Sequence, residues 1–174
     1  NDEIGSSIIS DSQYISFPLM ASISSIEIIL NPIIIETLTN TFCERPILTG
    51  SRYQKKILPS KTGLLPHKDK GESIVVITYL TPPSIQTGAT TVYKGSHLGT
   101  DKGGDLNPRV KDSEYFKEAI LKSYESKSVN GLKAGTTLIY WGKIIHSVPP
   151  FIKPGREVLM SSFSAESIYN ISKK

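Results

Sequence analysis

From residue 46 onward, short runs of β-branched and aromatic residues alternate with stretches rich in Gly, Pro and Ser. Runs of this kind, bounded by turn-forming residues, are typical of β-strands. Five of them stand out, at 46–58, 73–81, 89–95, 135–142 and 156–164. Because these strands outnumber the helices, the pattern predicts a mainly β fold, a closed or sandwiched jelly roll with a few flanking helices.

Two segments depart from the β pattern. Apolar residues recur at helical spacing within 112–126, where Asp112 can cap a helix. The stretch 19–40 carries one or two short apolar elements that are divided at Pro32, because proline does not continue a helix. We therefore expect one helix inside the β region and short apolar elements before it.

The 174 residues suit one domain with a full hydrophobic core. Within this single domain, 1–174, we expect a loose Ser- and Asp-rich arm at 1–18, a jelly-roll core at 46–165, and an inserted loop and helix at 97–130. Such insertions often shape a pocket, so this one is expected to act as a lid or else to be a solvated charge run. The sequence starts at Asn1 rather than Met, which suggests trimming of a longer protein.

Composition narrows the class of protein. The chain is 38% hydrophobic and 21% charged, which is ordinary for a folded protein, and no apolar stretch reaches the roughly 18 residues of a membrane span. Its 20 basic and 16 acidic residues are scattered, so no concentrated basic stripe indicates nucleic acid, and an anionic small molecule would suit the net charge of +4 as well. We expect a small-molecule or peptide substrate. Cys43 is the sole cysteine, which excludes an internal disulfide and fits a reducing, cytoplasmic setting. The oligomeric state does not follow from the sequence.

His67 and Asp69 stand two positions apart, just before a predicted strand. Side chains with this spacing on an extended chain point the same way, so the pair can offer an imidazole and a carboxylate to one ion. Alone, such a pair is most often ordinary surface polarity. A facial non-haem iron centre needs a second imidazole, for which the sequence offers His97 and His146. His146 is the better candidate because it follows a strand, whereas the turn "KGSHL" favours a loop or substrate-facing role for His97.

Arg156 begins the last predicted strand, ten residues after His146. A planar guanidinium is fitted to grip a carboxylate with two parallel hydrogen bonds. An arginine on a strand beside a metal therefore implies a dicarboxylate cosubstrate.

Three segments resemble the iron(II)/2-oxoglutarate-dependent oxygenase superfamily. The segment 62–82 resembles the HxD strand of prolyl hydroxylases, 88–98 resembles the "PGSH" stretch of the phytanoyl-CoA dioxygenase family, and 132–163 resembles the distal-histidine and arginine segment of both. The phytanoyl-CoA branch usually has Ser or Thr two residues after the histidine, where this chain has Val148, so the branch stays open. The resemblance implies a double-stranded β-helix, which is the cupin-like jelly roll that the strand pattern also predicts.

The resemblance also implies roles for individual residues. His67, Asp69 and His146 would hold iron(II), Arg156 would bind the distal carboxylate of 2-oxoglutarate, and Tyr79 would be a second donor to that carboxylate. Related halogenases replace the carboxylate ligand with Gly or Ala, so Asp69 implies hydroxylation of a substrate, with release of succinate and carbon dioxide. Zinc, nickel or manganese are expected substitutes for iron in the purified protein, because affinity alone does not select iron.

Two other functions stay open at this stage. In a non-catalytic jelly-roll binding domain, His67 and Asp69 would be surface groups, His146 a core histidine and Arg156 a structural cap. A cupin-like metalloenzyme would instead use its metal without 2-oxoglutarate. Iron-dependent formation of succinate from 2-oxoglutarate separates these alternatives. The loops carry no recognisable motif, so the substrate itself stays unidentified.

Overall fold

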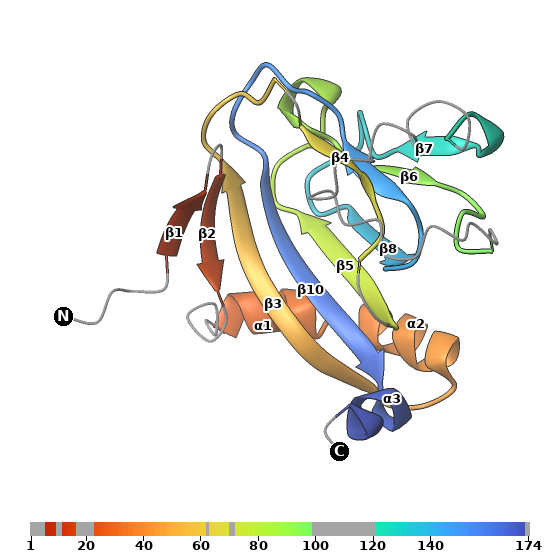
Figure 1. Cartoon of the computed structure of the whole chain (residues 1–174). Coiled ribbons are helices and arrows are strands. Elements are labelled where there is room, and N and C mark those ends of the chain that lie inside the picture. The colour runs from red at the N-terminus through yellow and green to blue at the C-terminus, as the bar shows by residue number, and fades with distance from the viewer. Residues whose placement is uncertain are drawn as a thin grey trace.

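Two antiparallel β-sheets form the body of the molecule in a computed structural model (Figure 1). The structure describes residues 6–9, 12–16, 23–61, 63–69, 72–98 and 121–172. Within these residues the larger sheet has six strands in the order β1-β2-β3-β10-β5-β8, and the smaller sheet has four in the order β4-β9-β6-β7. The two-sheet arrangement confirms the predicted jelly roll.

The strands of the larger sheet are β1 (Ser6–Ile9), β2 (Ser12–Ser16), β3 (Pro46–Lys56), β5 (Ser73–Tyr79), β8 (Thr137–Trp141) and β10 (Glu157–Ala165). Those of the smaller sheet are β4 (Leu64–His67), β6 (Thr91–Tyr93), β7 (Ser126–Ser128) and β9 (His146–Val148). The helical elements are α1 (Ile23–Ile29), α2 (Pro32–Phe42), α3 (Glu166–Ile171) and the 3₁₀ turns η1 (Ile85–Thr87) and η3 (Leu121–Ser123).

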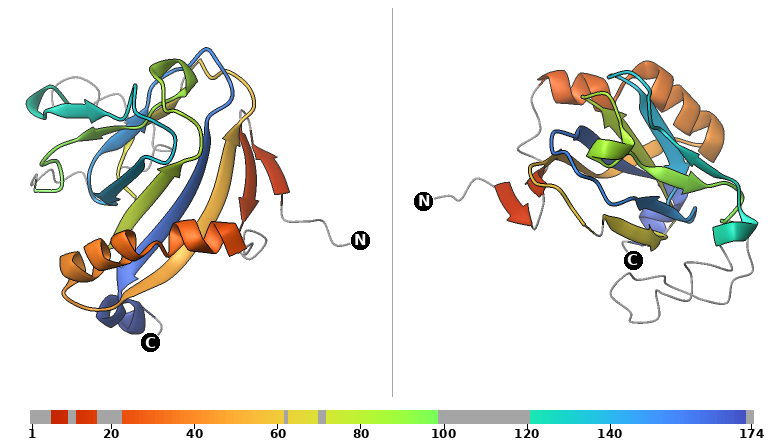
Figure 2. Two further views of the ribbon diagram at one scale, coloured as in Figure 1. Left: turned by 180° about the vertical axis from the view of Figure 1, so that it is seen from behind. Right: turned by 90° about the horizontal axis from the view of Figure 1, so that it is seen from above.

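The central strands of the larger sheet are buried on both faces, and successive side chains enter two different clusters. On β5, Ile74 and Val76 pack with buried residues of α1 and α2, whereas Val75, Ile77 and Tyr79 belong to the interior of the roll. This alternation follows from the period of two along a strand. Figure 2 shows the two helices lying across the outer face of the larger sheet, so the inner face is left to line the site.

Helix α2 begins at the proline that divides the predicted apolar stretch. Asn31 caps the helix by accepting a hydrogen bond from the Ile33 amide at 3.0 Å, and Pro32 at the first position sacrifices no intrahelical bond. Ile34 and Leu38, four residues apart on one face, are buried against the sheet. The stretch is therefore divided as predicted, and both of its parts are helical.

Short helix α3 is held to the sheet mainly by polar groups. Glu166 pairs with Arg45, and Ser167 donates from both its amide and its hydroxyl to the Glu44 carboxylate.

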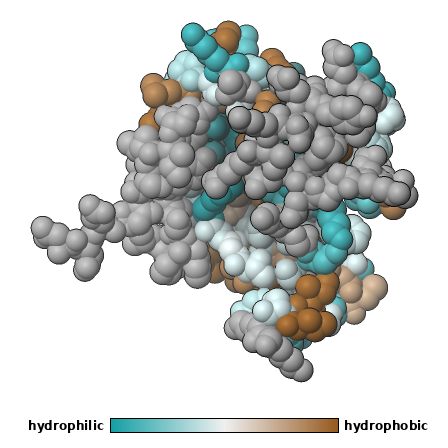
Figure 3. Space-filling view, viewed as in Figure 1, coloured by the Kyte–Doolittle hydropathy of each residue, from teal (hydrophilic) through white to brown (hydrophobic). Residues whose placement is uncertain are grey.

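The lower end of Figure 3, where α3 lies in Figure 1, carries exposed hydrophobic side chains. None of the helices in the described ranges is long and apolar enough to cross a membrane.

All five predicted strands are present, as β3, β5, β6, β8 and β10. The pattern did not reveal β4, β7 and β9, because these three- and four-residue strands lack the run of β-branched and aromatic residues that marks the equally short β6. Part of the segment 1–18, predicted as a loose arm, forms the hairpin β1-β2, and β2 pairs with the edge of β3. Backbone hydrogen bonds to that edge can order a segment that has few apolar anchors.

The predicted helix at 112–126 and the predicted lid lie largely outside the described residues. Of that helix, the described end forms η3, and β7 begins at Ser126. The charged stretch 99–111 also falls outside the described ranges.

Candidate metal centre

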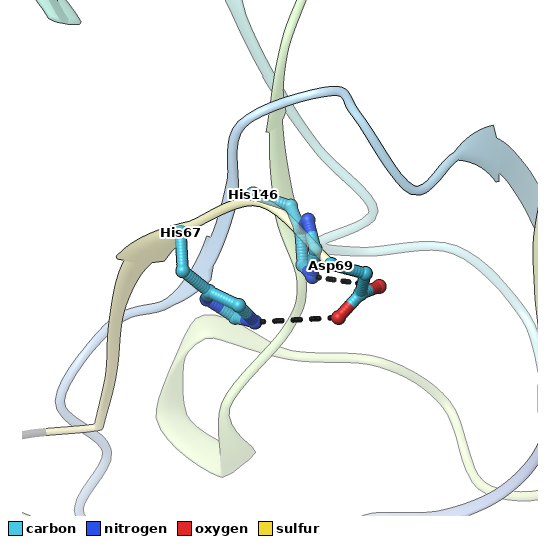
Figure 4. A group of neighbouring side chains, drawn as sticks. All are labelled: His67, Asp69 and His146. Atoms are coloured by element: carbon cyan, nitrogen blue, oxygen red, sulfur yellow. Dashed lines mark ion pairs between the residues drawn. The ribbon is translucent and has the colours of Figure 1, made fainter. Parts of the chain in front are cut away.

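Two paired strands of the smaller sheet bring the predicted ligands together. His67 ends β4 and His146 begins β9, and the antiparallel register places the two residues opposite each other. Their ring centroids lie 4.2 Å apart. Asp69 follows two residues after His67, and the candidate ligand atoms of all three residues lie within 4.8 Å of one another (Figure 4). The strand pairing thus supplies the second imidazole that the HxD pair lacks.

A glycine in the turn after β8 holds Asp69 in place. The Asp69 amide donates to the Gly142 carbonyl at 2.8 Å, and the Gly142 amide donates to the Ser73 carbonyl at 2.8 Å. A Cβ at position 142 would lie 3.1 Å from that Ser73 oxygen and 3.2 Å from the Asp69 Cβ. A side chain here would therefore push against the segment that carries the carboxylate, and glycine permits this close approach of the turn.

Both imidazoles are oriented by their own strands. The Nδ1 of His67 lies 2.8 Å from the Leu65 carbonyl, and the Nδ1 of His146 lies 3.0 Å from the Ile144 carbonyl. A carbonyl oxygen can only accept, so each Nδ1 carries the proton and each Nε2 presents its lone pair. Backbone support of this kind fixes the tautomer that metal-binding histidines need.

The two lone pairs face the carboxylate from different directions. The Nε2 atom of His67 lies 3.8 Å from Oδ1 of Asp69, and that of His146 lies 3.6 Å from Oδ2 (Figure 4). The side chains of His67 and His146 are only 12% and 6% exposed, whereas that of Asp69 is 37% exposed. The group is therefore enclosed on the histidine side and open on the carboxylate side.

Burial keeps the His146 imidazole neutral. Desolvation, with a smaller effect from the neighbouring His67, lowers its pKa to about 4, although Asp69 and the hydrogen bond to Ile144 act in the opposite direction. At neutral pH the His146 Nε2 atom is therefore available as a ligand and not occupied by a proton.

This donor set fits a divalent transition metal. Two neutral imidazoles and one carboxylate on one side are the ligands of a facial non-haem iron site, and they also suit zinc, nickel or manganese. Cis ligands about 2.1 Å from one ion lie roughly 3 Å apart, so closure onto a metal requires only a small contraction of the separations seen here. The sole cysteine, Cys43, is exposed at the end of α2 and takes no part.

Arg156 and Tyr79 lie together in the interior of the roll. The Arg156 side chain, 3% exposed, donates from Nη1 to the Gly88 carbonyl and from Nη2 to Oε1 of Gln54 at 2.9 Å. Its guanidinium carbon lies 6.0 Å from the centroid of the Tyr79 ring. The Tyr79 hydroxyl donates to Oγ1 of Thr90 at 2.7 Å. Both predicted cosubstrate residues thus point inward.

Tyr140 links this pair to the histidines, and the sequence did not reveal it. Its buried ring lies 4.7 Å from the His146 ring and belongs to the same interior cluster as Tyr79. Burial raises the pKa of its phenol, the charges of Asp69 and Tyr79 raise it further, and Arg156 partly offsets them. Tyr140 therefore lies within electrostatic reach of both the metal group and Arg156. An aromatic residue on a strand ordinarily signals core packing, which is why sequence alone gave it no role.

Ser96 ties the two ligand-bearing segments to each other. This fully buried residue accepts a hydrogen bond at Oγ from the Ile145 amide at 2.8 Å, directly before His146. Its carbonyl accepts from Nζ of Lys68 at 3.1 Å, and Lys68 stands between His67 and Asp69. The "GSH" turn thus has a structural role that its sequence did not disclose.

His97, the alternative third ligand, lies outside the group of three. Its ring centroid lies 5.9 Å from that of Trp141, an exposed side chain at the end of β8. A substrate-facing role for His97 stays a prediction.

Comparisons with known proteins identify a family. Residues 58–150, more than half of the chain, match the model of the phytanoyl-CoA dioxygenase (PhyH) family. The matched span includes His67, Asp69 and His146, and it ends before Arg156. No curated protein matches the sequence.

Several solved structures share the fold at low sequence identity. The non-haem alpha ketoglutarate dependent epimerase SnoN from nogalamycin biosynthesis is 16% identical with a TM-score of 0.70, over 89% of this chain and 63% of SnoN. HygX from Streptomyces hygroscopicus, with nickel, 2-oxoglutarate and hygromycin B bound, is 10% identical with a TM-score of 0.66, over 95% of this chain and 75% of HygX. The carbocyclase SnoK is 15% identical with a TM-score of 0.63, over 91% of this chain and 68% of SnoK.

At these identities the likeness establishes the fold, and the chain spans less than two thirds of SnoN. The family match, in contrast, covers the HxD segment, the "GSH" turn and the distal histidine in one continuous span. It also decides between the two branches that the sequence left open. The chain belongs to the phytanoyl-CoA dioxygenase (PhyH) family.

Proposed function

We propose that the protein is an iron(II)- and 2-oxoglutarate-dependent dioxygenase that hydroxylates a small-molecule or peptide substrate and releases succinate and carbon dioxide. One observation carries the proposal: two buried Nε2 lone pairs and a carboxylate face one small space, and a buried guanidinium lies within the same roll. Membership of a dioxygenase family supports it. So do the neighbours, because SnoN was solved with Fe3+ and alpha ketoglutarate, and HygX with nickel and 2-oxoglutarate.

In this proposal His67, Asp69 and His146 hold the metal. Bound iron(II), together with 2-oxoglutarate and oxygen, supplies the oxidising power needed to attack an unactivated C–H bond. The chain contributes fixed ligand directions through the two Nδ1–H bonds to backbone carbonyls. Asp69 contributes the negative charge that partly balances the ion. Retention of this carboxylate supports hydroxylation over halogenation, which needs that position open.

Arg156 binds the distal carboxylate of 2-oxoglutarate. Gln54 and the Gly88 carbonyl hold its guanidinium in place before the cosubstrate arrives, so little conformational freedom is lost on binding. The Tyr79 hydroxyl is a second donor to the same carboxylate. Its hydrogen bond to Thr90 would then reverse direction, with Thr90 Oγ1 donating to the phenol oxygen.

Burial of the histidines favours this proposal over a non-catalytic binding domain. A core position for His146 is expected in either case, but a surface role for His67 does not explain a side chain that is only 12% exposed, with its Nε2 atom and that of His146 both turned toward the Asp69 carboxylate. The buried position of Arg156 favours it over a cupin-like metalloenzyme without 2-oxoglutarate, because a desolvated guanidinium is suited to an anionic partner.

Succinate formation tests the proposal. Protein loaded with iron(II) should convert 2-oxoglutarate to succinate in the presence of oxygen, and Asp69→Ala and His146→Ala should abolish the conversion. His97→Ala is the matched control, because it removes an imidazole near the site but outside the group of three. Nickel titration should show a loss of roughly 100-fold or more in affinity for the two ligand variants and little change for the control.

Each alternative has its own signature in this experiment. Metal binding without turnover of 2-oxoglutarate, with or without added substrates, would favour the cupin-like metalloenzyme. Wild-type protein that binds neither nickel nor iron(II) would favour the non-catalytic domain.

A further inference from the structure

Strand β3 presents polar side chains to the interior of the roll. Residues two apart on a strand share a face, so Arg52 and Gln54 point to the same side. Gln54 is buried and bonded to Arg156, which identifies that side as the interior. Tyr53, on the opposite face, packs with the cluster beneath α1 and α2. Arg52 therefore belongs to the inner face of the sheet.

On the inner face of the larger sheet, the row of residues that begins at Arg52 lies between the row of Gln54 and the row of Tyr140. Rows of opposed residues run across β3, β10, β5 and β8. Only every second row faces the interior. Of these inner rows, one begins at Gln54, which holds Arg156, and the next begins at Arg52. The third inner row ends at Tyr140 on β8. The Tyr140 ring lies beside His146. On the inner face, the row of Arg52 is therefore adjacent both to the row that holds Arg156 and to the row that reaches the wall of the metal site.

Exposure distinguishes Arg52 from its interior neighbours on β3. Gln54 and Lys56 are buried, whereas Arg52 is exposed. A molecule that arrives from solvent can therefore reach Arg52 without displacing core residues. A cosubstrate held by buried Arg156 would occupy the deeper part of the same interior.

We propose that Arg52 is a substrate-binding residue that recognises a carboxylate or phosphate group on the substrate. The inference rests on the proposed function and names the class of molecule that the same site oxidises. A guanidinium matches both anions with paired hydrogen bonds, which a lone ammonium cannot do. Held by its anionic group at Arg52, the substrate would extend past Tyr140 toward the metal group.

Binding of simple anions to the loaded protein tests this proposal. Nickel-loaded protein saturated with 2-oxoglutarate has its cosubstrate position filled and does not turn over. Benzoate, phenyl phosphate and neutral benzamide are then titrated by ligand-observed NMR into wild type, Arg52→Gln and Arg45→Gln. Arg45 is the matched control because it directly precedes β3, is exposed and pairs with Glu166 on α3. The two anions should bind wild type and control alike, and Arg52→Gln roughly tenfold more weakly.

Three results would overturn the proposal. The first is that wild type and Arg52→Gln bind the anions with equal affinity. The second is that wild type binds the anions no more tightly than benzamide. The third is a fall in 2-oxoglutarate affinity in Arg52→Gln with anion affinity unchanged, which would assign Arg52 to the cosubstrate. A failure of the proposed function would be detected separately, because wild-type protein would then not bind nickel or 2-oxoglutarate before any probe is added. The same anion titration on metal-free protein then still decides whether Arg52 binds anions.

Discussion

Replacing Arg156 with alanine should remove most of the affinity for 2-oxoglutarate. The guanidinium is 3% exposed and is held by Gln54 and the Gly88 carbonyl, so a carboxylate bound to it is largely desolvated. Losing one partner of such a pair costs about 2–5 kcal/mol, and about 3 kcal/mol corresponds to roughly a 100-fold weaker dissociation constant. Isothermal titration of 2-oxoglutarate into nickel-loaded protein measures this directly. Arg156→Lys should lie between wild type and alanine, since an ammonium keeps the charge but not the fork.

A comparison of two cosubstrates separates this effect from damage to the fold. The alanine variant also removes the hydrogen bonds that Arg156 donates to Gln54 and to the Gly88 carbonyl, each worth about 1 kcal/mol, so some loss of stability is expected. Pyruvate carries the same 2-oxo acid group as 2-oxoglutarate but lacks the distal carboxylate. Wild type should therefore prefer 2-oxoglutarate by roughly 100-fold, and Arg156→Ala should lose that preference. A folded alanine variant that still prefers 2-oxoglutarate as strongly as wild type would refute the assignment of Arg156.

Three further predictions concern the metal group. Ser96→Ala removes the acceptor of the buried Ile145 amide, so nickel affinity should fall about tenfold, and an unchanged affinity would show that the turn does not position the ligands. Gly142→Ala should lower nickel affinity by displacing Asp69, whereas Gly50→Ala, where an added Cβ meets nothing within 4 Å, should not; equal affinities in the two variants would contradict the close-approach argument. In metal-free protein, the lowered pKa of His146 means that the unfolded chain takes up a proton at this histidine before the folded chain does, as pH falls from about 6.5 to about 4. The free energy of unfolding, measured by urea denaturation, should therefore fall by up to about 3 kcal/mol over that window. His146→Asn should not show this loss.

The predictable part of the fold consists of long, strongly patterned elements. Strands β3, β5, β8 and β10 have five or more residues and carry β-branched or aromatic side chains, and α2 carries its start signal in Asn31 and Pro32. The HxD pair was readable because both residues lie on one short segment. The pairing of β4 with β9, which sets His67 opposite His146, joins segments nearly 80 residues apart and follows from no local pattern.

The remaining site residues depend on register and tertiary contact. Tyr140 and Arg52 acquire their proposed importance from the rows in which they sit across four strands, and a shift of one residue would turn either side chain to the other face. Ser96 acts through a buried hydrogen bond to a strand almost 50 residues further along the chain. A sequence without its folded register shows only a tyrosine, an arginine and a serine at these positions.

A crystal structure of the protein with nickel and 2-oxoglutarate would test the central claim most directly. One ion should lie about 2.0–2.3 Å from Nε2 of His67, Nε2 of His146 and a carboxylate oxygen of Asp69, with the distal carboxylate of the cosubstrate on the Arg156 guanidinium. An ion bound elsewhere, or one coordinated without His146, would contradict the metal assignment. A 2-oxoglutarate whose distal carboxylate lies away from Arg156 would contradict the cosubstrate assignment.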